Sequence, residues 1–318
     1  MLDTPPSPVT ENLTAVADFV EADCLKRNDH TISQEDLVRI LGKEYETNDE
    51  RLREFSGEVF SELGQRSFHS GTGGIQYPYK VEKSGSMLRF LKDCSNKHWT
   101  YLFLLMATRL NMKSNRDHAG LDGTQLFEQL CAIVADRFWG GPCAEVESQV
   151  FGTGRVAGDL KDDEFLPTTL KFGKRVNELC ELIGEGAGFK AKHSDRVTAR
   201  DGKLDIVVVR RFTDKRDGQL IGFGQCKTGT HWTNDLTKLR PDDFSTKWLC
   251  QAPAVSPVRM YFITDRVILR WYEHSVDGGI LFDRCRILEY CKKLPTSLEK
   301  SIAKWAKAAA KSSGIKIR

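Results

Sequence analysis

The stretch DGKLDIVVVRRF at positions 201–212, followed by LIGFGQCKTG at positions 220–229, decides how the central part of this chain folds. The first run is rich in β-branched residues, which favour strands. Between the two runs lies DKRDG at 214–218, and its closing Asp-Gly pair is typical of a turn that joins antiparallel strands. The sequence therefore predicts a β-hairpin whose first strand starts at an acid, Asp205.

The second strand of this hairpin carries two polar residues whose presence in an apolar run needs an explanation. Side chains alternate along a strand, so Ile221, Phe223, Gln225 and Lys227 share one face, and the hairpin brings Asp205 beside them. A buried polar group without a partner is costly, which favours a functional role for Gln225 and Lys227. The alternative is that they are solvated residues of an edge strand. We interpret Asp205, Gln225 and Lys227 as a catalytic site.

This set of side chains suits the hydrolysis of a phosphodiester. The Asp205 carboxylate, the Gln225 side-chain carbonyl and the main-chain carbonyl of Cys226 are oxygen ligands of the kind that Mg²⁺ prefers. A bound metal ion polarises the scissile phosphate and lowers the pKa of a water molecule. The ammonium of Lys227 then orients or deprotonates that water and neutralises charge in the transition state. The sequence thus predicts an Mg²⁺-dependent hydrolase in which Mn²⁺ can substitute.

Asp205 together with the Gln225-Cys226-Lys227 run resembles the PD-(D/E)XK restriction-endonuclease-like superfamily. The pattern is most similar to Mrr-type restriction enzymes and related prokaryotic defence nucleases, which carry QxK in place of (D/E)xK. The resemblance covers about residues 120–290. It implies an α/β (α+β) fold with a central mixed sheet flanked by helices, and Mg²⁺-dependent cleavage of double-stranded DNA. Because Gln225 is neutral, such a site is expected to hold its metal more weakly than an acidic version.

Nucleases of this superfamily also use a glutamate from a helix that precedes the core strands, and two residues compete for this role. Glu178 lies 27 residues before Asp205, which is a comfortable spacing. Glu128, in LFEQL at 126–130, resembles the Phe-Glu pair of many members but requires a long insertion before Asp205. Each is equally well explained as an ordinary exposed helix residue, so both alternatives stay open.

Two further segments are candidates for contact with substrate. His231 and Trp232 follow Lys227 in a loop at the mouth of the predicted site, although the indole is more simply explained by packing. The helix predicted at about 296–311 places a stripe of lysines on one face. These are Lys300, Lys304, Lys307 and Lys311. Such a stripe neutralises phosphates in nucleic-acid-binding proteins, and a solvated face is the commoner meaning.

The N-terminal third reads as a separate module. Helices are predicted from Glu11 to about Leu25, with Thr10 as its N-cap, and at 31–42, where Thr31 and Gln34 fit a capping box. A longer helix and a hairpin at 77–90 follow, and the whole resembles a winged helix-turn-helix, a topology that contacts either DNA or protein. The predicted domains are therefore 1–95, 96–295 and 296–318.

Composition excludes several classes of protein. Lys plus Arg number 47 and Asp plus Glu 44, so the net charge of +3 gives no general argument for a nucleic-acid partner. The nine cysteines include no CxxC pair, and neither a disulfide framework nor a structural zinc site is indicated. No GxxxxGK[ST] loop indicates an NTPase, and no apolar run approaches the ~20 residues of a membrane span. With no secretory signal at its start, the chain is expected to be cytoplasmic.

The function predicted from these features is that of a metal-dependent DNA endonuclease, in restriction or antiphage defence. The alternative is a catalytically inactive nuclease-fold subunit that binds nucleic acid or a partner protein in a defence complex. An RNA-cutting enzyme of the same fold is a third possibility. Homo-oligomerisation and a partner ATPase or helicase both stay open as expectations.

Overall fold

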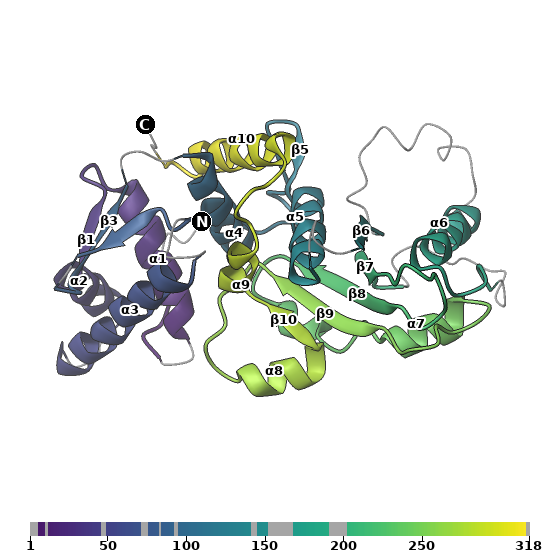
Figure 1. The fold of residues 1–318 in the computed structure, drawn as a ribbon. Helices are drawn as coiled ribbons and strands as arrows, with labels where there is room; N and C mark the ends of the chain where they lie inside the picture. The colour runs from purple at the N-terminus through teal and green to yellow at the C-terminus, as the bar shows by residue number, and fades with distance from the viewer. Residues whose placement is uncertain are drawn as a thin grey trace. The chain divides into compact units, whose positions relative to one another are not determined.

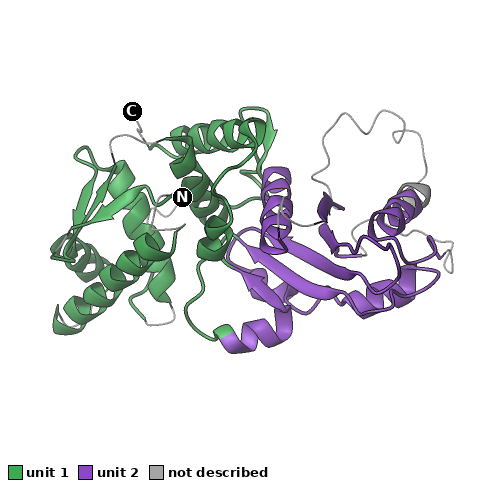
Figure 2. Ribbon diagram, viewed as in Figure 1, with its two compact units in different colours: residues 1–123, 264–271, 283–318 green, residues 124–263, 272–282 purple. Residues whose placement is uncertain are grey.

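The computed structural model describes residues 6–9, 12–45, 49–70, 76–82, 84–91, 95–140, 145–151, 168–190 and 202–315. The chain forms two compact units (Figure 2). The first comprises residues 1–123, 264–271 and 283–318, and the second comprises residues 124–263 and 272–282. This division differs from the boundaries expected at residues 95 and 295, because helices on both sides of the central segment belong to the first unit.

The N-terminal part of the first unit consists of helices and a small antiparallel sheet (Figure 1). Its elements are, in chain order, α1 (Leu13–Lys26), β1 (Thr31–Ser33), α2 (Gln34–Glu44), α3 (Asp49–His69), β2 (Tyr79–Val81) and β3 (Met87–Phe90). The strands lie in the order β1-β3-β2, and both pairs are antiparallel. The hairpin predicted at 77–90 is confirmed as β2 and β3. The expected cap residue Thr10 lies outside the described residues.

The second N-terminal helix begins later than predicted. Residues Thr31–Ser33 form strand β1, which pairs with β3, and α2 starts only at Gln34. The N-cap is Ser33, whose hydroxyl accepts a hydrogen bond from the Asp36 N–H at 3.1 Å. The Asp36 carboxylate in turn accepts one from the Ser33 N–H at 3.1 Å. The capping box expected from Thr31 was wrong, because pairing with β3 takes the backbone of Thr31 into a strand.

The rest of the first unit is mainly helical. It contains α4 (Asn96–Arg109), the short strands β4 (Asp117–His118) and β5 (Leu121–Asp122), α9 (Arg284–Glu289) and α10 (Thr296–Ser312). Helix α10 packs against α4, with the Trp305 and Phe103 rings 5.1 Å apart. The Trp305 indole N–H also donates to the Arg116 carbonyl at 2.9 Å. Among the described residues, no helix combines the length and apolar character needed to cross a bilayer.

The second unit is a mixed sheet flanked by helices (Figure 1), which confirms the predicted mixed α/β class. Its elements are α5 (Gly123–Phe138), β6 (Val146–Val150), α6 (Thr168–Ile183), β7 (Ile206–Arg210), β8 (Leu220–Lys227), the 3₁₀ turn η6 (Trp232–Asp235), α7 (Pro241–Trp248), β9 (Val258–Ile263), α8 (Trp271–Gly278) and β10 (Ile280–Phe282). The strand order is β10-β9-β8-β7-β6. Strands β6, β7 and β8 are antiparallel neighbours, whereas β8, β9 and β10 run parallel.

Two helices pack on one face of this sheet and α5 approaches the other. Residues of α6 and α7, such as Phe172 and Phe244, share a buried core with Val207 and Phe223 of the strands. On the opposite face, a Cβ added to Gly222 would lie 2.7 Å from the Trp139 ring at the end of α5. The absence of a side chain at position 222 therefore allows the indole to lie against the strand.

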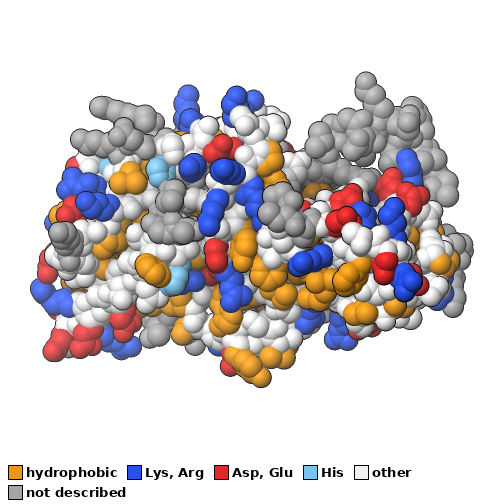
Figure 3. All heavy atoms as spheres, in the orientation of Figure 1, with side chains coloured by type: hydrophobic (Ala, Val, Ile, Leu, Met, Phe, Trp, Pro, Cys, Tyr) orange, Lys and Arg blue, Asp and Glu red, His pale blue; other side chains and the backbone are white. Residues whose placement is uncertain are grey.

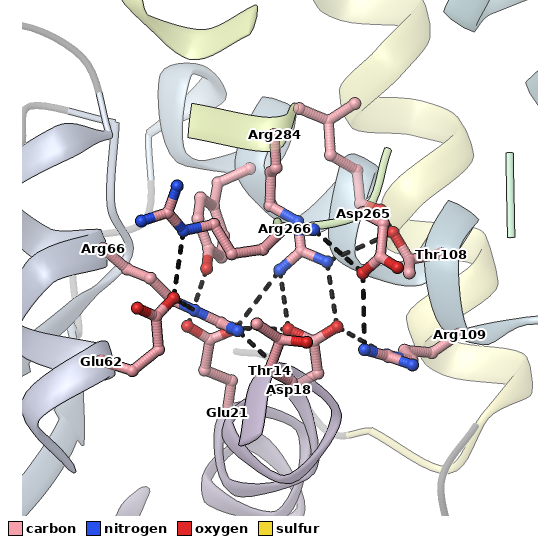
Figure 4. Close-up of polar contacts among 12 residues, drawn as sticks. Thr14, Asp18, Glu21, Glu62, Arg66, Thr108, Arg109, Asp265, Arg266 and Arg284 are labelled. Atoms are coloured by element: carbon pink, nitrogen blue, oxygen red, sulfur yellow. Dashed lines mark hydrogen bonds and ion pairs between the residues drawn. The ribbon is translucent and has the colours of Figure 1, made fainter. Parts of the chain in front are cut away.

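A cluster of buried charges joins four helices of the first unit (Figure 4). Asp18 of α1 is its centre: Oδ1 lies 2.6 Å from Arg66 Nη1 and 2.9 Å from Arg284 Nη1, and Oδ2 lies 2.5 Å from Arg109 Nε. Burial on its own would raise the pKa of Asp18, but the charges of Arg109, Arg284 and Arg66 outweigh it and lower the pKa. Asp18 is therefore held in its ionised form.

Glu21, one turn further along α1, lies in the same cluster in a different environment. Its Oε1 accepts hydrogen bonds from the hydroxyls of Tyr77 at 2.8 Å and Tyr101 at 2.7 Å, and its Oε2 lies 3.1 Å from Arg66 Nη1. Burial raises the pKa of Glu21, although the neighbouring Arg66 charge opposes this. The carboxylate is thus fully engaged by partners from α3, α4 and the segment before β2.

The charge cluster links residues 1–95 to later parts of the first unit. Helices α1 and α3 supply Asp18 and Arg66, whereas Arg109 belongs to α4 and Arg284 to α9. Ion pairs between buried groups thus join residues 1–95 to the helices that follow them. The boundary expected at residue 95 lies inside the first compact unit.

Candidate active site

The predicted hairpin forms, and it places Asp205 at the end of the ladder between β7 and β8. Ile206 pairs with Gly224, and one step further along this register lie Asp205 and Gln225. The Asp205 N–H donates to the Gly224 carbonyl at 2.9 Å, and the Asp205 carbonyl accepts from the Phe151 N–H at 2.8 Å. Residues opposite each other in an antiparallel pair have their side chains on the same face. The backbone thus holds Asp205 firmly beside Gln225.

The Asp205 carboxylate lies in a partly buried, polar setting. Its Oδ2 accepts a hydrogen bond from the Cys226 N–H at 2.8 Å. Burial raises the pKa of Asp205 to about 6, against the opposing effects of that hydrogen bond and of the Lys227 and Lys203 charges. A carboxyl group whose pKa is raised by burial beside a specific cation is a common feature of active sites.

Gln225 is buried without satisfying its acceptor. The side chain is 1% exposed, and its Oε1 has no hydrogen-bond partner among the described residues. Leaving a buried carbonyl oxygen unpaired costs about 1–3 kcal/mol. An amide oxygen in this condition, next to the Asp205 carboxylate, fits a role as ligand to a hard cation or as acceptor from a bound molecule.

Lys227 extends from the last position of β8 and forms an ion pair that the sequence did not suggest. Its Nζ lies 2.6 Å from Oδ2 of Asp235, in η6, and both side chains are partly exposed. The second oxygen of Asp235 pairs with Lys238. Burial alone would raise the pKa of Asp235, but the hydrogen bonds and charges of Lys227 and Lys238 outweigh burial and lower the pKa. No spacing rule links an Asp eight positions beyond a strand lysine, so sequence patterns carried no signal for this residue.

Of the two glutamate candidates, Glu128 is the one whose charge reaches β8. Glu128 lies on α5 and is buried. The thiols of Cys131 on α5 and Cys226 on β8 hydrogen-bond to each other, and burial raises the pKa of both. The negative charges of Glu128 and Asp205 also raise the pKa of both thiols. Both carboxylates therefore lie near Cys131 and Cys226.

Glu178 lies on α6, a helix that is inserted between β6 and β7. This insertion accounts for the long separation between Glu128 and Asp205 that the sequence left unexplained. Helix α6 turns its apolar residues, among them Val176 and Leu179, toward the sheet. Glu178 itself is only partly buried. Glu128, whose charge acts on the Cys226 thiol of β8, is therefore the better candidate for a second acidic residue near Asp205.

The loop after Lys227 divides into one exposed and one buried residue. His231 is exposed. The Trp232 ring is 6% exposed and lies edge-on to His274, with centroids 4.9 Å apart. The Trp232 carbonyl accepts a hydrogen bond from the Tyr261 hydroxyl at 2.8 Å. Trp232 therefore packs in the interior, as the simpler of the two interpretations has it. Of the two residues, only His231 is accessible to a substrate.

The oxygen donors at this end of the hairpin suit a magnesium ion that completes its shell with water and substrate. The ligands that the structure offers are the Asp205 carboxylate and the unpaired Gln225 Oε1, beside the main chain of Cys226. Within the described residues, no three His, Cys, Asp or Glu side chains come together as a metal site. Mg²⁺ is commonly bound through one or two carboxylates plus substrate phosphates, so the available residues fit such an ion.

The four lysines of the C-terminal helix lie on one exposed face of α10, as predicted. The opposite face of α10, with Ile302 and Trp305, is buried in the first unit. Lys307 Nζ lies 5.3 Å from the centre of the Trp99 ring, and the other three lysines extend from the same face. On the face drawn in Figure 3, both positive and negative side chains are exposed.

If this stripe contacts phosphates, replacing Lys300, Lys304, Lys307 and Lys311 with alanine will flatten the plot of log binding constant against log salt. The slope is expected to change by about 3–4, because each phosphate contact contributes roughly 0.9. A control with the same loss of charge replaces the exposed lysines Lys43, Lys80, Lys113 and Lys292. Equal slopes for both variants in fluorescence anisotropy titrations would show that the stripe is merely solvated.

Comparison of the whole chain with protein-family models, with curated proteins and with solved structures found no match.

Proposed function

We propose that this protein is a metal-dependent nuclease that hydrolyses phosphodiester bonds in DNA, with a site of the PD-(D/E)XK type in its QxK form. The observation that carries this proposal is the unpaired, buried Gln225 Oε1 beside the Asp205 carboxylate, with Lys227 two residues further along the same strand. Gln225 and Lys227 lie on a strand of a mixed sheet that is flanked by helices, and Asp205 precedes the neighbouring strand. A role in restriction or antiphage defence, suggested by the same resemblance, and a cytoplasmic location are part of this proposal.

The residues take the following roles under this proposal. Asp205, Gln225 and the Cys226 carbonyl would hold Mg²⁺, with Glu128 as the nearby second carboxylate. When bound, the ion supplies Lewis-acid polarisation of the phosphate and a more acidic water. The Lys227 ammonium orients the attacking water and offsets the negative charge that grows on the phosphate oxygens. The partly buried position of Asp205 strengthens each of these electrostatic effects.

The site contains ammonium groups that could contact the phosphates of a polyanionic substrate. Lys203 acts on the Asp205 carboxylate, Lys227 lies at the end of β8, and Lys238 shares Asp235 with Lys227. Three ammonium groups thus lie near the carboxylates of the site, although the chain as a whole is nearly neutral. These ammonium groups offer contacts to phosphate oxygens.

The N-terminal elements follow the order of a winged helix, and their surface favours contact with protein over contact with DNA. In a winged helix-turn-helix the helix before the wing faces the nucleic acid, and α3 occupies that position here. Its exposed residues include four acids and two arginines. These are Asp49, Glu50, Glu54, Glu58, Arg51 and Arg53. An acidic face repels phosphates, so we propose that this part recruits a protein partner, for which an ATPase or helicase is one candidate and a second copy another.

The alternative function is a catalytically inactive subunit that only binds nucleic acid or a partner. The neutral Gln225 favours it, because the site has one negative charge fewer than an acidic version. The direct test incubates the purified protein with supercoiled DNA and with RNA of matched sequence, in Mg²⁺, in Mn²⁺ and in EDTA. Cleavage of DNA that requires metal supports the nuclease, cleavage of RNA alone reassigns the substrate, and binding in EDTA without cleavage in either metal supports the inactive subunit.

Gln225→Glu is expected to lower the Mg²⁺ concentration at half-maximal activity. A second carboxylate beside Asp205 adds one negative charge to the ligand set, which tightens the binding of a hard cation. An increase in affinity of about tenfold corresponds to 1.4 kcal/mol, a modest charge effect. The measurement is a Mg²⁺ titration of the initial cleavage rate. Gln251→Glu, at an exposed position of the same unit, is the control and is expected to leave the midpoint unchanged.

A further inference from the structure

The ion pair of Lys227 with Asp235 lies at the end of β8, where the predicted chemistry takes place. Lysine has a long flexible side chain, and its ammonium samples several rotamers unless a partner holds it. Here Asp235 Oδ2 lies 2.6 Å from Lys227 Nζ. We propose that Asp235 is a positioning residue, which holds the Lys227 ammonium in the orientation needed to act on the water and the phosphate. This inference rests on the nuclease function proposed above.

Asp235 is held in place by a turn that β9 anchors. The turn η6 starts at Trp232, whose buried ring lies against His274 and whose carbonyl accepts the Tyr261 hydroxyl at 2.8 Å. Tyr261 is on β9, paired directly with Gln225 of β8. The carboxylate of Asp235 is therefore fixed relative to the same strands that carry Asp205 and Lys227. A group attached to a rigid frame is able to orient a flexible one.

Asp235, Lys227 and Lys238 form a cluster whose net charge leaves the Lys227 ammonium able to attract a phosphate. Asp235 pairs with Lys238 through its other oxygen, so two ammonium groups share one carboxylate and the cluster keeps a net positive charge. A phosphate oxygen is therefore still attracted to Lys227 while Asp235 holds it. The charges of both Asp235 and Asp205 also act on the Tyr261 phenol, whose pKa is raised mainly by its burial. The two carboxylates thus lie near the same buried tyrosine, on adjoining parts of one site.

The stability of the fold does not depend on this pair. Both side chains are partly exposed, and ion pairs of that kind contribute little to the free energy of unfolding. Removal of the Asp235 charge is therefore expected to leave the protein folded and to change its function alone.

The experiment compares Asp235→Asn, Asp235→Glu and the control Asp243→Asn, which removes an exposed carboxylate at the start of α7. Asp235→Asn is expected to lower kcat for DNA cleavage by about 10²-fold with little change in KM, because a misplaced catalytic group loses rate more than affinity. Asp235→Glu is expected to restore part of the rate, and Asp243→Asn to behave as the unmodified protein. An unchanged kcat in Asp235→Asn, with a cleaving unmodified protein, overturns the positioning role.

A second measurement is independent of activity. In ¹⁵N-labelled protein, an ion-paired lysine ammonium gives a resonance protected from rapid hydrogen exchange. The resonance of Lys227, identified by its loss in Lys227→Arg, is expected to be visible in the unmodified protein and lost in Asp235→Asn. A resonance that is absent from the start, or unchanged in Asp235→Asn, overturns the inference about the pair. An unmodified protein that cuts no nucleic acid overturns the nuclease proposal instead, whatever the resonance shows.

Discussion

Lys227→Ala is expected to lower the rate of DNA cleavage by about 10²–10⁴-fold, the range for loss of a positioned acid–base group. The ammonium acts on the attacking water and on charge that develops only in the transition state, so its removal lowers kcat far more than it weakens binding. Lys227 is partly exposed and pairs only with Asp235 among the ion pairs of the described residues. Its loss is therefore expected to leave the midpoint of thermal unfolding nearly unchanged.

The measurement is the single-turnover rate on labelled DNA in saturating Mg²⁺, together with the equilibrium binding constant in EDTA. Asp205→Asn is expected to behave similarly, because it removes the anionic oxygen while the side chain keeps its shape. Lys113→Ala, at an exposed lysine of the other unit, is the control and is expected to keep full activity. A Lys227→Ala protein that cuts DNA at the unmodified rate, free of contaminating nuclease, removes the basis of the proposed function.

Asp18→Ala is expected to destabilise the first unit by about 3–5 kcal/mol, the usual cost of removing one partner from a buried ionic cluster. The substitution leaves Arg66, Arg109 and Arg284 close together without their shared counter-ion. Since whole domains are stable by only about 5–15 kcal/mol, a large part of the folding free energy is lost. The measurement is urea unfolding followed by far-ultraviolet circular dichroism.

Asp23→Ala is the matched control, since Asp23 lies on the same helix and pairs with Arg27 at the surface at 2.8 Å. Its expected cost is below about 1 kcal/mol. If Asp18→Ala does not yield folded protein, Arg109→Met offers a second test, because Arg109 is also part of the cluster and its loss leaves Asp18 with two arginines. A loss of stability in Asp18→Ala no greater than in Asp23→Ala would contradict the assigned role of the cluster.

The hairpin and the three residues on it are local features, and for that reason the sequence was enough to find them. Alternation along a strand has a period of two, so the relation of Gln225 to Lys227 is independent of the rest of the fold. The Asp-Gly turn fixed the direction of the second strand, and Asp205 then lay close to Gln225, as the register of β7 and β8 bears out. The mixed α/β class followed from the same pattern of strands and helices.

The local sequence pattern also predicted the wrong first residue for one helix. Thr31 and Ser33 both have a side chain able to cap a helix, and each is followed three residues later by a side chain able to close a capping box. Pairing of Thr31–Ser33 with β3, more than fifty residues away, decided between them. When two neighbouring residues are equally able to cap a helix, contacts with residues distant in the sequence decide which of them does so.

Only the tertiary structure revealed the partner of Lys227, the preference for Glu128 and the division into units. Asp235 reaches Lys227 because a 3₁₀ turn is anchored by Tyr261 on β9, a contact that no periodicity encodes. The charge of Glu128 acts on Cys226 of β8, although β6 and the inserted helix α6 lie between Glu128 and β8 in the chain. Asp18 and Arg284 are 266 positions apart, yet they share one buried cluster. The sequence alone determined which chemical groups a strand presents on each face. Which of these groups contact one another was decided by the tertiary structure, because a buried charge is stable only beside a partner, and that partner can come from a distant part of the chain.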